Sequence, residues 1–260
     1  MSRGLAARIR ILCFHPRAGR LAGAVLAAAA VLGPSAGAIA QQPKPFDAPV
    51  TVKNLPPKSD AEPQEVRCTY YPDLMVREVF DGPTAIAPAL VLGNSAPCTA
   101  KANPGAREIE MADMVLDGRK GPFLLFSQMD PKDSTGFIVI HAPTGKAVLK
   151  DAALGDPQTM RLALDGTGAL TFSYNRGANL SCSILEKPAA CWAQSVKEGL
   201  VPQSMASQVP AAKLCAAAYK QAQSPRDNPS VLSYARTVVI GSGGDVTETA
   251  RGPVSCTPAS

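Results

Sequence analysis

The chain has 260 residues, of which 18% are charged and 5% aromatic, and its formal net charge at neutral pH is +5. The whole excess lies in residues 1–40, which hold five Arg and no Lys, Asp or Glu. After residue 40, the remaining 21 basic residues are balanced in number by 21 acidic residues, so the formal net charge of this part of the chain is zero. Such a chain has no electrostatic reason to bind nucleic acid or an anionic membrane.

Residues 1–40 have the pattern of a secretory signal peptide. A basic region from Arg3 to Arg20 precedes an apolar run at 21–33, and Ala38-Ile39-Ala40 has the small-x-small form that a signal peptidase reads. The apolar run covers 13 residues, whereas a membrane-spanning helix needs about 20. We expect cleavage near Ala40, no membrane span afterwards, and a periplasmic or extracellular location in a bacterium. The alternative is a buried, Ala-rich helix.

Residues 41–65 are predicted to form an extended, Pro-rich disordered linker. Pro breaks helices and cannot donate to a strand ladder, and this stretch contains Pro43, Pro45, Pro49, Pro56, Pro57 and Pro63. Residues 66–260 then have the length of one domain. A chain of that size buries about 70% of its unfolded surface.

The cysteines predict disulfides. The chain has seven Cys, and Cys13 leaves with the signal peptide, so an even number remains in an oxidising compartment. Six Cys allow fifteen pairings, and short local loops favour sequential neighbours: Cys68–Cys98, Cys182–Cys191 and Cys215–Cys256. No Cys-x-x-Cys occurs, which argues against a zinc ribbon or a redox pair.

Several segments predict strands. Residues 74–80 and 123–126 are short apolar runs bounded by turn residues. The clearest hairpin is 160–174, where apolar residues alternate on both sides of Asp165-Gly166. Alternation continues at 180–184, and Lys187-Pro188 is then expected to turn the chain into a second strand at Cys191-Trp192.

Repeated Thr-Gly turns predict an antiparallel meander. They stand at Thr135-Gly136, Thr144-Gly145 and Thr167-Gly168, each before an apolar run. These turns resemble those in the inner hairpins of propeller blades. A closed propeller, however, needs at least four blades of about 40 residues, which this chain does not accommodate.

The C-terminal part predicts a helix and a hairpin. Residues 210–222 have helical spacing and end before Pro225, and a short helix is also expected near 193–199. Residues 231–240 and 246–255 flank a Gly-rich turn. The predicted fold is mainly β: a single domain of antiparallel sheet or meander, sandwich-like, with one C-terminal α-helix, stabilised by disulfides.

Candidate catalytic residues are few. His141 is the only histidine after the leader and needs a nucleophile and an orienting acid. The candidates by sequence are Ser127, Ser134, Asp133 and Asp151. Four acids are close enough in sequence to suggest a glycosidase-like pair, namely Glu108, Glu110, Asp113 and Asp117. The ordinary interpretations are a strand-end histidine and a solvated charged segment.

Two loops resemble known sites only in part. Residues 130–136 lack the alternating acids and distal Glu of a Ca²⁺ loop, and they have an extra residue compared with an aspartic-protease loop. Residues 143–147 lack the first Gly and the hydroxyl of a phosphate loop. No metal, cofactor or catalytic site is predicted.

The sequence therefore favours an exported, non-enzymatic binding or envelope-interaction module. Its expected partner is an unidentified protein, peptide or small ligand. Residues 231–240, as a hydrophobic strand edge, are a candidate surface for a partner strand. The alternative is a secreted or periplasmic hydrolase that uses carboxylates or His141.

Overall fold

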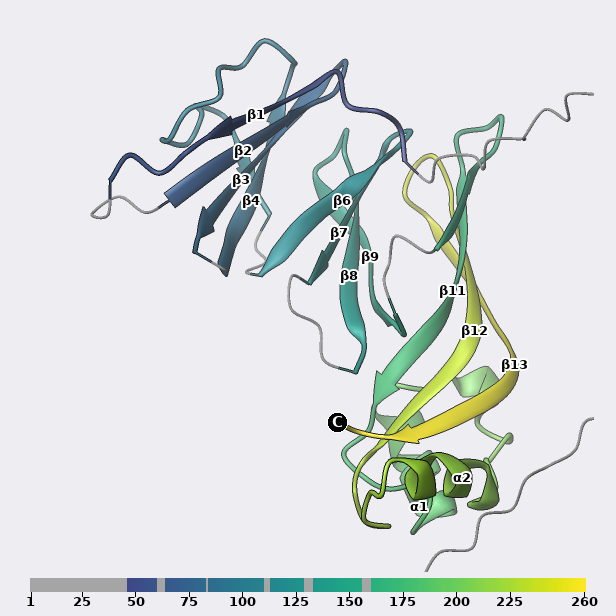
Figure 1. Cartoon of the computed structure of the whole chain (residues 1–260). Helices are drawn as coiled ribbons and strands as arrows, with labels where there is room; N and C mark the ends of the chain where they lie inside the picture. The colour runs from purple at the N-terminus through teal and green to yellow at the C-terminus, as the bar shows by residue number, and fades with distance from the viewer. Residues whose placement is uncertain (1–45, 60–63, 83, 110–112, 129–132, 156–159) are drawn as a thin grey trace, which may run out of the picture. The chain divides into compact units, whose positions relative to one another are not determined.

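The computed structural model describes residues 46–59, 64–82, 84–109, 113–128, 133–155 and 160–260. These residues form two antiparallel sheets (Figure 1), which confirms the predicted mainly β, antiparallel fold class. The first sheet has the order β1-β2-β3-β4-β5, with strands Thr51–Leu55, Gln64–Tyr70, Leu74–Asp81, Thr84–Leu92 and Arg107–Glu108. The predicted signal peptide and residues 130–131 lie outside the described residues.

The second sheet has the order β13-β12-β11-β9-β8-β7-β6, and β10 pairs with β11 beside this path. Its strands are β6 Met114–Lys120, β7 Phe123–Gln128, β8 Thr135–His141, β9 Lys146–Ala153, β10 Arg161–Leu164, β11 Leu170–Asn179, β12 Ser230–Ile240 and β13 Val246–Pro258. The expected strands at 74–80 and 123–126 and the hairpins at 160–174 and 231–255 are confirmed. Each depends on local alternation across a turn.

The helical region differs from the prediction in one place. β11 ends at Asn179, and residues 180–184 are irregular and form no strand. Pro188 begins helix α1, Pro188–Lys197, instead of turning the chain into a strand. A proline fits the first turn of a helix because its missing N–H has no intrahelical partner there. Helix α2, Lys213–Gln221, lies within the predicted range 210–222.

Part of the predicted linker is built into the first sheet. β1 lies within residues 41–65 and pairs antiparallel with β2. Just before it, Phe46 packs against the core of the second sheet. The backbone N–H of Asp47 donates to the carbonyl of Arg119 at 2.8 Å, and its carboxylate accepts from the N–H of Gly121 at 2.7 Å. Phe46, Asp47 and β1 are therefore attached to the folded sheets.

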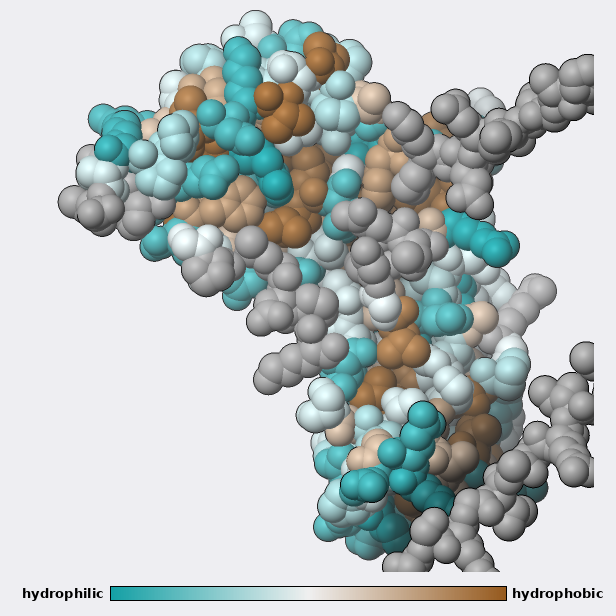
Figure 2. Space-filling view, in the orientation of Figure 1, coloured by the Kyte–Doolittle hydropathy of each residue, from teal (hydrophilic) through white to brown (hydrophobic). Residues whose placement is uncertain are grey.

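The buried apolar residues form clusters on both sheets. One cluster combines residues of β3 and β4 with residues of β7 and β8 and so joins the two sheets. A second lies on β7, β8, β11 and β12 around Phe137 and Phe172. A third packs Trp192 and Tyr219 of the two helices against β12. At the surface, apolar residues emerge in separate patches among polar ones (Figure 2).

A buried carboxylate adds a polar link between the sheets. Glu78 on β3 is 1% exposed and accepts two hydrogen bonds from Arg67 at 2.9 and 3.0 Å. It also accepts the backbone N–H of Leu116 on β6 at 2.8 Å. β6 has a register shift between Leu116 and Gly118. Such a bulge disrupts the local ladder, and here the N–H of Leu116 bonds to Glu78.

Three disulfides cross-link the described part of the chain, and they join the cysteine pairs that the spacing predicts. Cys68–Cys98 fixes the loop after β4, and Cys182–Cys191 links the turn after β11 to α1. Cys215–Cys256 ties α2 to β13. These bonds are compatible with an extracellular or other oxidising compartment. None of the helices in the described ranges has the length and apolar composition needed to cross a membrane.

Candidate functional site

The candidate site lies where β11 changes partner strands. β10 pairs with residues 170–173 of β11, whereas β9 pairs at Arg176 only. Between them, Asn175 uses its carbonyl to accept the backbone N–H of Leu154. Within the described ranges, Tyr174 therefore has no ladder partner on this side, although β12 pairs with β11 along its whole length. This interruption leaves room beside β11.

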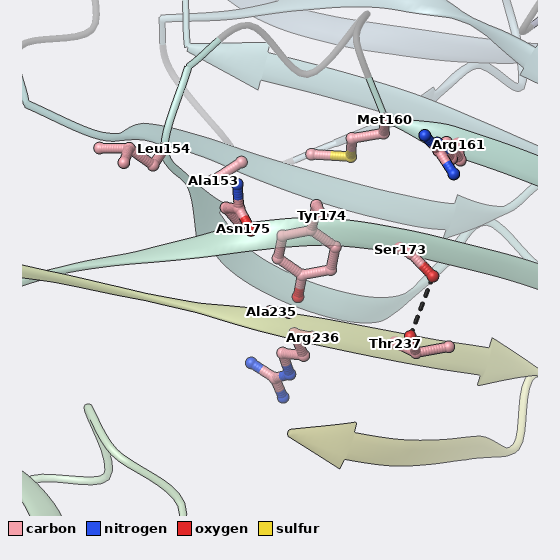
Figure 3. A pocket seen from close by; sticks show the side chains of 10 residues that line it. All are labelled: Ala153, Leu154, Met160, Arg161, Ser173, Tyr174, Asn175, Ala235, Arg236 and Thr237. Carbon is pink, nitrogen blue, oxygen red and sulfur yellow. Dashed lines mark hydrogen bonds between the residues drawn. The ribbon is translucent and has the colours of Figure 1, made fainter. Parts of the chain in front are cut away.

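A cavity of about 460 Å³ occupies this interruption (Figure 3). Its size falls within the range of small-molecule sites, about 300–1,000 Å³. The lining combines hydroxyl, amide and guanidinium groups with a few apolar side chains. The described residues that line it are Ala153, Leu154, Met160, Arg161, Ser173, Tyr174, Asn175, Ala235, Arg236 and Thr237.

A row of polar side chains crosses the sheet at this cavity. Arg161 on β10 is opposite Ser173 on β11, Ser173 is opposite Thr237 on β12, and Thr237 is opposite Thr249 on β13. Side chains at directly opposite positions share one face of a sheet. The hydroxyls of Ser173 and Thr237 are hydrogen-bonded at 2.9 Å (Figure 3). Each hydroxyl oxygen keeps capacity for a further hydrogen bond.

A buried charge network supports the cavity from the opposite face of the sheet. Asp151 on β9 has a side chain that is 2% exposed, and it pairs with Arg176 at 2.7 Å and with Arg236. The hydroxyl of Tyr174 donates a third hydrogen bond to this carboxylate. Arg236 also pairs with Glu248 on β13. The network joins four strands and fixes the two lining residues Tyr174 and Arg236.

Burial and neighbouring charges shift the pKa values of Tyr174, Tyr234 and Arg236. Burial, reinforced by the charge of Asp151, raises the pKa of Tyr174 above its ordinary value, so the phenol stays protonated and donates. Burial also raises the pKa of Tyr234, whose hydroxyl donates to the carbonyl of Leu200 at 3.3 Å. Burial opposes the charge of Arg236, but Asp151 and Glu248 outweigh it and raise the pKa of the guanidinium.

Two lining side chains remain available to a ligand. In the described part of the chain, Arg161 and Asn175 are exposed and their side chains have no hydrogen bond or ion pair. Arg161 lies on β10 and Asn175 on the adjacent strand β11, and Ser173 lies between Arg161 and Thr237 (Figure 3). The site thus offers a guanidinium, an amide and two hydroxyls, which can bind a polar molecule.

A second cavity, of about 830 Å³, lies at the ends of β1, β2 and β3. One wall is apolar, with Leu55, Pro56 and Val66, and the other is the loop after the Cys98 disulfide. Buried Arg77 holds this loop by donating to the carbonyls of Thr99 and Ala100. Burial lowers the pKa of Arg77. The described lining of this cavity also includes both acidic and basic side chains, namely Asp81, Lys58 and Lys101.

The structure separates the catalytic candidates named from the sequence. His141 is buried, its Nδ1 lies 3.1 Å from Thr144 Oγ1, and its ring packs on Phe123. Ser127 instead donates to Asp117 at 2.9 Å. Within the described residues, no hydrogen bond joins His141 to a serine or an acid.

Two of the other candidates bond to groups elsewhere in the chain. Ser134 bonds to Asn179, and Asp133 accepts the backbone N–H of Ser260. Glu108 is exposed on β5, and Asp113 has a positive φ of 61° in the connection before β6. Glu110 lies outside the described residues. Only Asp151, of all these, contributes to the site at β11.

Residues 231–240 do not form a free edge. They belong to β12, which pairs with β11 on one side and with β13 on the other. The expectation of a free edge at this position is wrong, because β13 follows the Gly-rich turn and pairs antiparallel with the side of β12 that β11 leaves open. In the described residues, groups of three or more His, Cys, Asp or Glu that could hold a metal are absent.

Sequence reasoning missed Arg161, Ser173 and Thr237 as site residues. The usable signal was the polar side of the 160–174 hairpin, which places Arg161 and Ser173 on one face. The pairing with Thr237 spans 64 residues and needs the register of β12. Comparison with protein-family models, curated proteins and solved structures finds no match for this chain.

Proposed function

We propose that this chain is an exported, non-enzymatic binding protein that holds a small polar ligand in the cavity beside β11. The observation that carries the proposal is the cavity of about 460 Å³ with hydroxyl, amide and guanidinium groups on its wall. A pocket with a few well-placed polar groups is the usual form of a ligand site. The buried Asp151 network holds part of that wall in place before a ligand arrives, which reduces the entropic cost of binding.

The proposal of export is supported by the leader and by the disulfides. Residues 1–40 combine a basic region, an apolar run and a small-x-small exit. The three disulfides persist in an oxidising compartment. Mass spectrometry of the protein from its native host should find a chain that begins at Gln41 and has no free thiol. A chain that still begins at Met1 would contradict export.

Binding is tested by thermal unfolding of the exported, disulfide-bonded protein. The probes are monosaccharides, sugar alcohols, hydroxy acids and amino acids, each at millimolar concentration. A ligand at about 100 times its Kd stabilises by about 2.7 kcal/mol, which raises Tm by about 5–10 °C for a domain of this size. Mass spectrometry should recover the bound compound unchanged, as a protein without catalytic activity requires.

Matched variants locate the binding. Thr237→Val keeps the side-chain volume and removes the hydroxyl from the cavity, so it should weaken binding and reduce the thermal shift by about a third to a half. Thr247→Val makes the same change on β13, at an exposed position outside the cavity, and should preserve the shift. The proposal fails if no probe gives a saturable shift, or if both variants bind equally well.

A further inference from the structure

We infer that the ligand of this cavity carries a carboxylate, bound by Arg161, and hydroxyl groups, bound by Ser173 and Thr237. This inference rests on the binding function proposed above. It adds the chemical class of the ligand, a hydroxylated carboxylic acid.

Among the described residues that line the cavity, Arg161 is the cationic side chain that can pair with a ligand. The described lining residues include two Arg and no Asp or Glu. Arg236 is neutralised, because it pairs with Asp151 and Glu248. Arg161 has no such partner in the described chain. A ligand with one negative charge would therefore complete the pairing, and a cationic ligand would be repelled.

The strand register sets the spacing of the polar groups. Neighbouring strands lie about 4.8 Å apart. Ser173 is one strand from Arg161, and Thr237 is two strands away, about 10 Å in all. The Arg161 side chain is long enough to reach back over the row. A ligand of one sugar-acid unit can then place its carboxylate at Arg161 and its hydroxyls over Ser173 and Thr237.

The guanidinium geometry favours a carboxylate. Its planar fork donates two parallel hydrogen bonds to the two oxygens of one carboxylate. Such charge-assisted bonds should make an acid bind about 10- to 100-fold more tightly than its neutral counterpart. Since Arg161 is exposed, salt should screen part of this preference.

The test uses probes that differ only in the acidic group. Isothermal titration compares galacturonate with galactose, and gluconate with glucitol, on the exported, disulfide-bonded protein. The acids should bind at least 10-fold more tightly than the neutral compounds. Arg161→Gln should remove that preference, and it should leave the neutral compounds unaffected. Lys213→Gln, the same loss of charge on α2 and outside the cavity, should keep the preference.

The outcomes separate the inference from the proposed function. Equal binding of acid and neutral probes, or an unchanged preference in Arg161→Gln, overturns the inference, while Thr237→Val still tests the cavity. Failure of both acids when other polar probes bind also overturns it. Tighter binding of galactose 1-phosphate than of galacturonate would assign Arg161 to a phosphate instead. If no polar probe binds at all, the proposed function fails and the inference fails with it.

Discussion

Replacing Asp151 with Asn should lower the free energy of unfolding by about 3 kcal/mol. The carboxylate is almost fully buried and pairs with Arg176 and Arg236, whose side chains are 12% and 13% exposed. Removing one partner of a buried pair costs about 3–5 kcal/mol, because the remaining charge is left uncompensated. The lower end applies here, since each Arg is partly solvated and keeps another partner, the Leu200 carbonyl or Glu248.

Urea unfolding at neutral pH measures this loss, followed by the fluorescence of Trp192 and by circular dichroism. The matched control is Asp245→Asn, in the exposed turn between β12 and β13. It should change the unfolding free energy by less than about 0.5 kcal/mol. Tyr174→Phe removes a single hydrogen bond to the same carboxylate and should cost about 1.5 kcal/mol.

A double-mutant cycle tests whether the charges act as a unit. Arg176→Gln in the Asp151→Asn background removes one of the cations that the first change leaves unpaired. The double variant should therefore lose at least about 1 kcal/mol less than the sum of the two single losses. Additive losses, or an Asp151→Asn variant as stable as Asp245→Asn, would refute the reasoning.

Three further predictions concern the fold. A Cβ at Gly118 would lie 2.5 Å from Cγ of Phe46, so Gly118→Ala should cost about 1–3 kcal/mol in urea unfolding. Gly166→Ala, which meets open space in a turn, should cost less than about 0.5 kcal/mol. Burial raises the pKa of Tyr71 to about 12. The unfolded chain loses this proton near pH 10, so Tyr71 should make stability fall above pH 10, by up to about 1.4 kcal/mol per pH unit. Tyr71→Phe should reduce that slope. The Cys182–Cys191 disulfide closes the shortest of the three loops. Replacing both of its cysteines with Ser should lower the free energy of unfolding by about 2.7 kcal/mol at 25 °C, measured against the oxidised protein.

The features that the sequence predicts are those with local causes. The hairpin at 160–174 depends on alternation on both sides of Asp165-Gly166, and all of that signal lies within fifteen residues. The segment at 180–184 shows the limit of the same reasoning. It alternates, but the Cys182–Cys191 disulfide and the helix that begins at Pro188 take the chain away from the sheet.

The site depends on contacts that alternation does not reveal. Asp151 and Arg236 are 85 residues apart in the sequence. They meet because β9, β11 and β12 are neighbours in the sheet, an order that leaves β10 beside the path. A charged residue in a strand is usually expected to face solvent, and nothing local marks Asp151 as buried. Its partners become identifiable only when the strand register is known.

The buried network and the cavity depend on the same register. On one face of β11 and β12, apolar residues such as Phe172 and Val238 lie on one side of the charges, and Ala178 and Leu232 lie on the other. A slip of two residues between these strands would keep every side chain on its own face of the sheet, because side chains alternate with period two. The same slip would separate Arg236 from Asp151 and leave buried charges unpaired, at a cost of several kcal/mol. It would also move Thr237 away from Ser173 on the opposite face. The charges on the inner face therefore select the one alignment that assembles the polar row on the outer face.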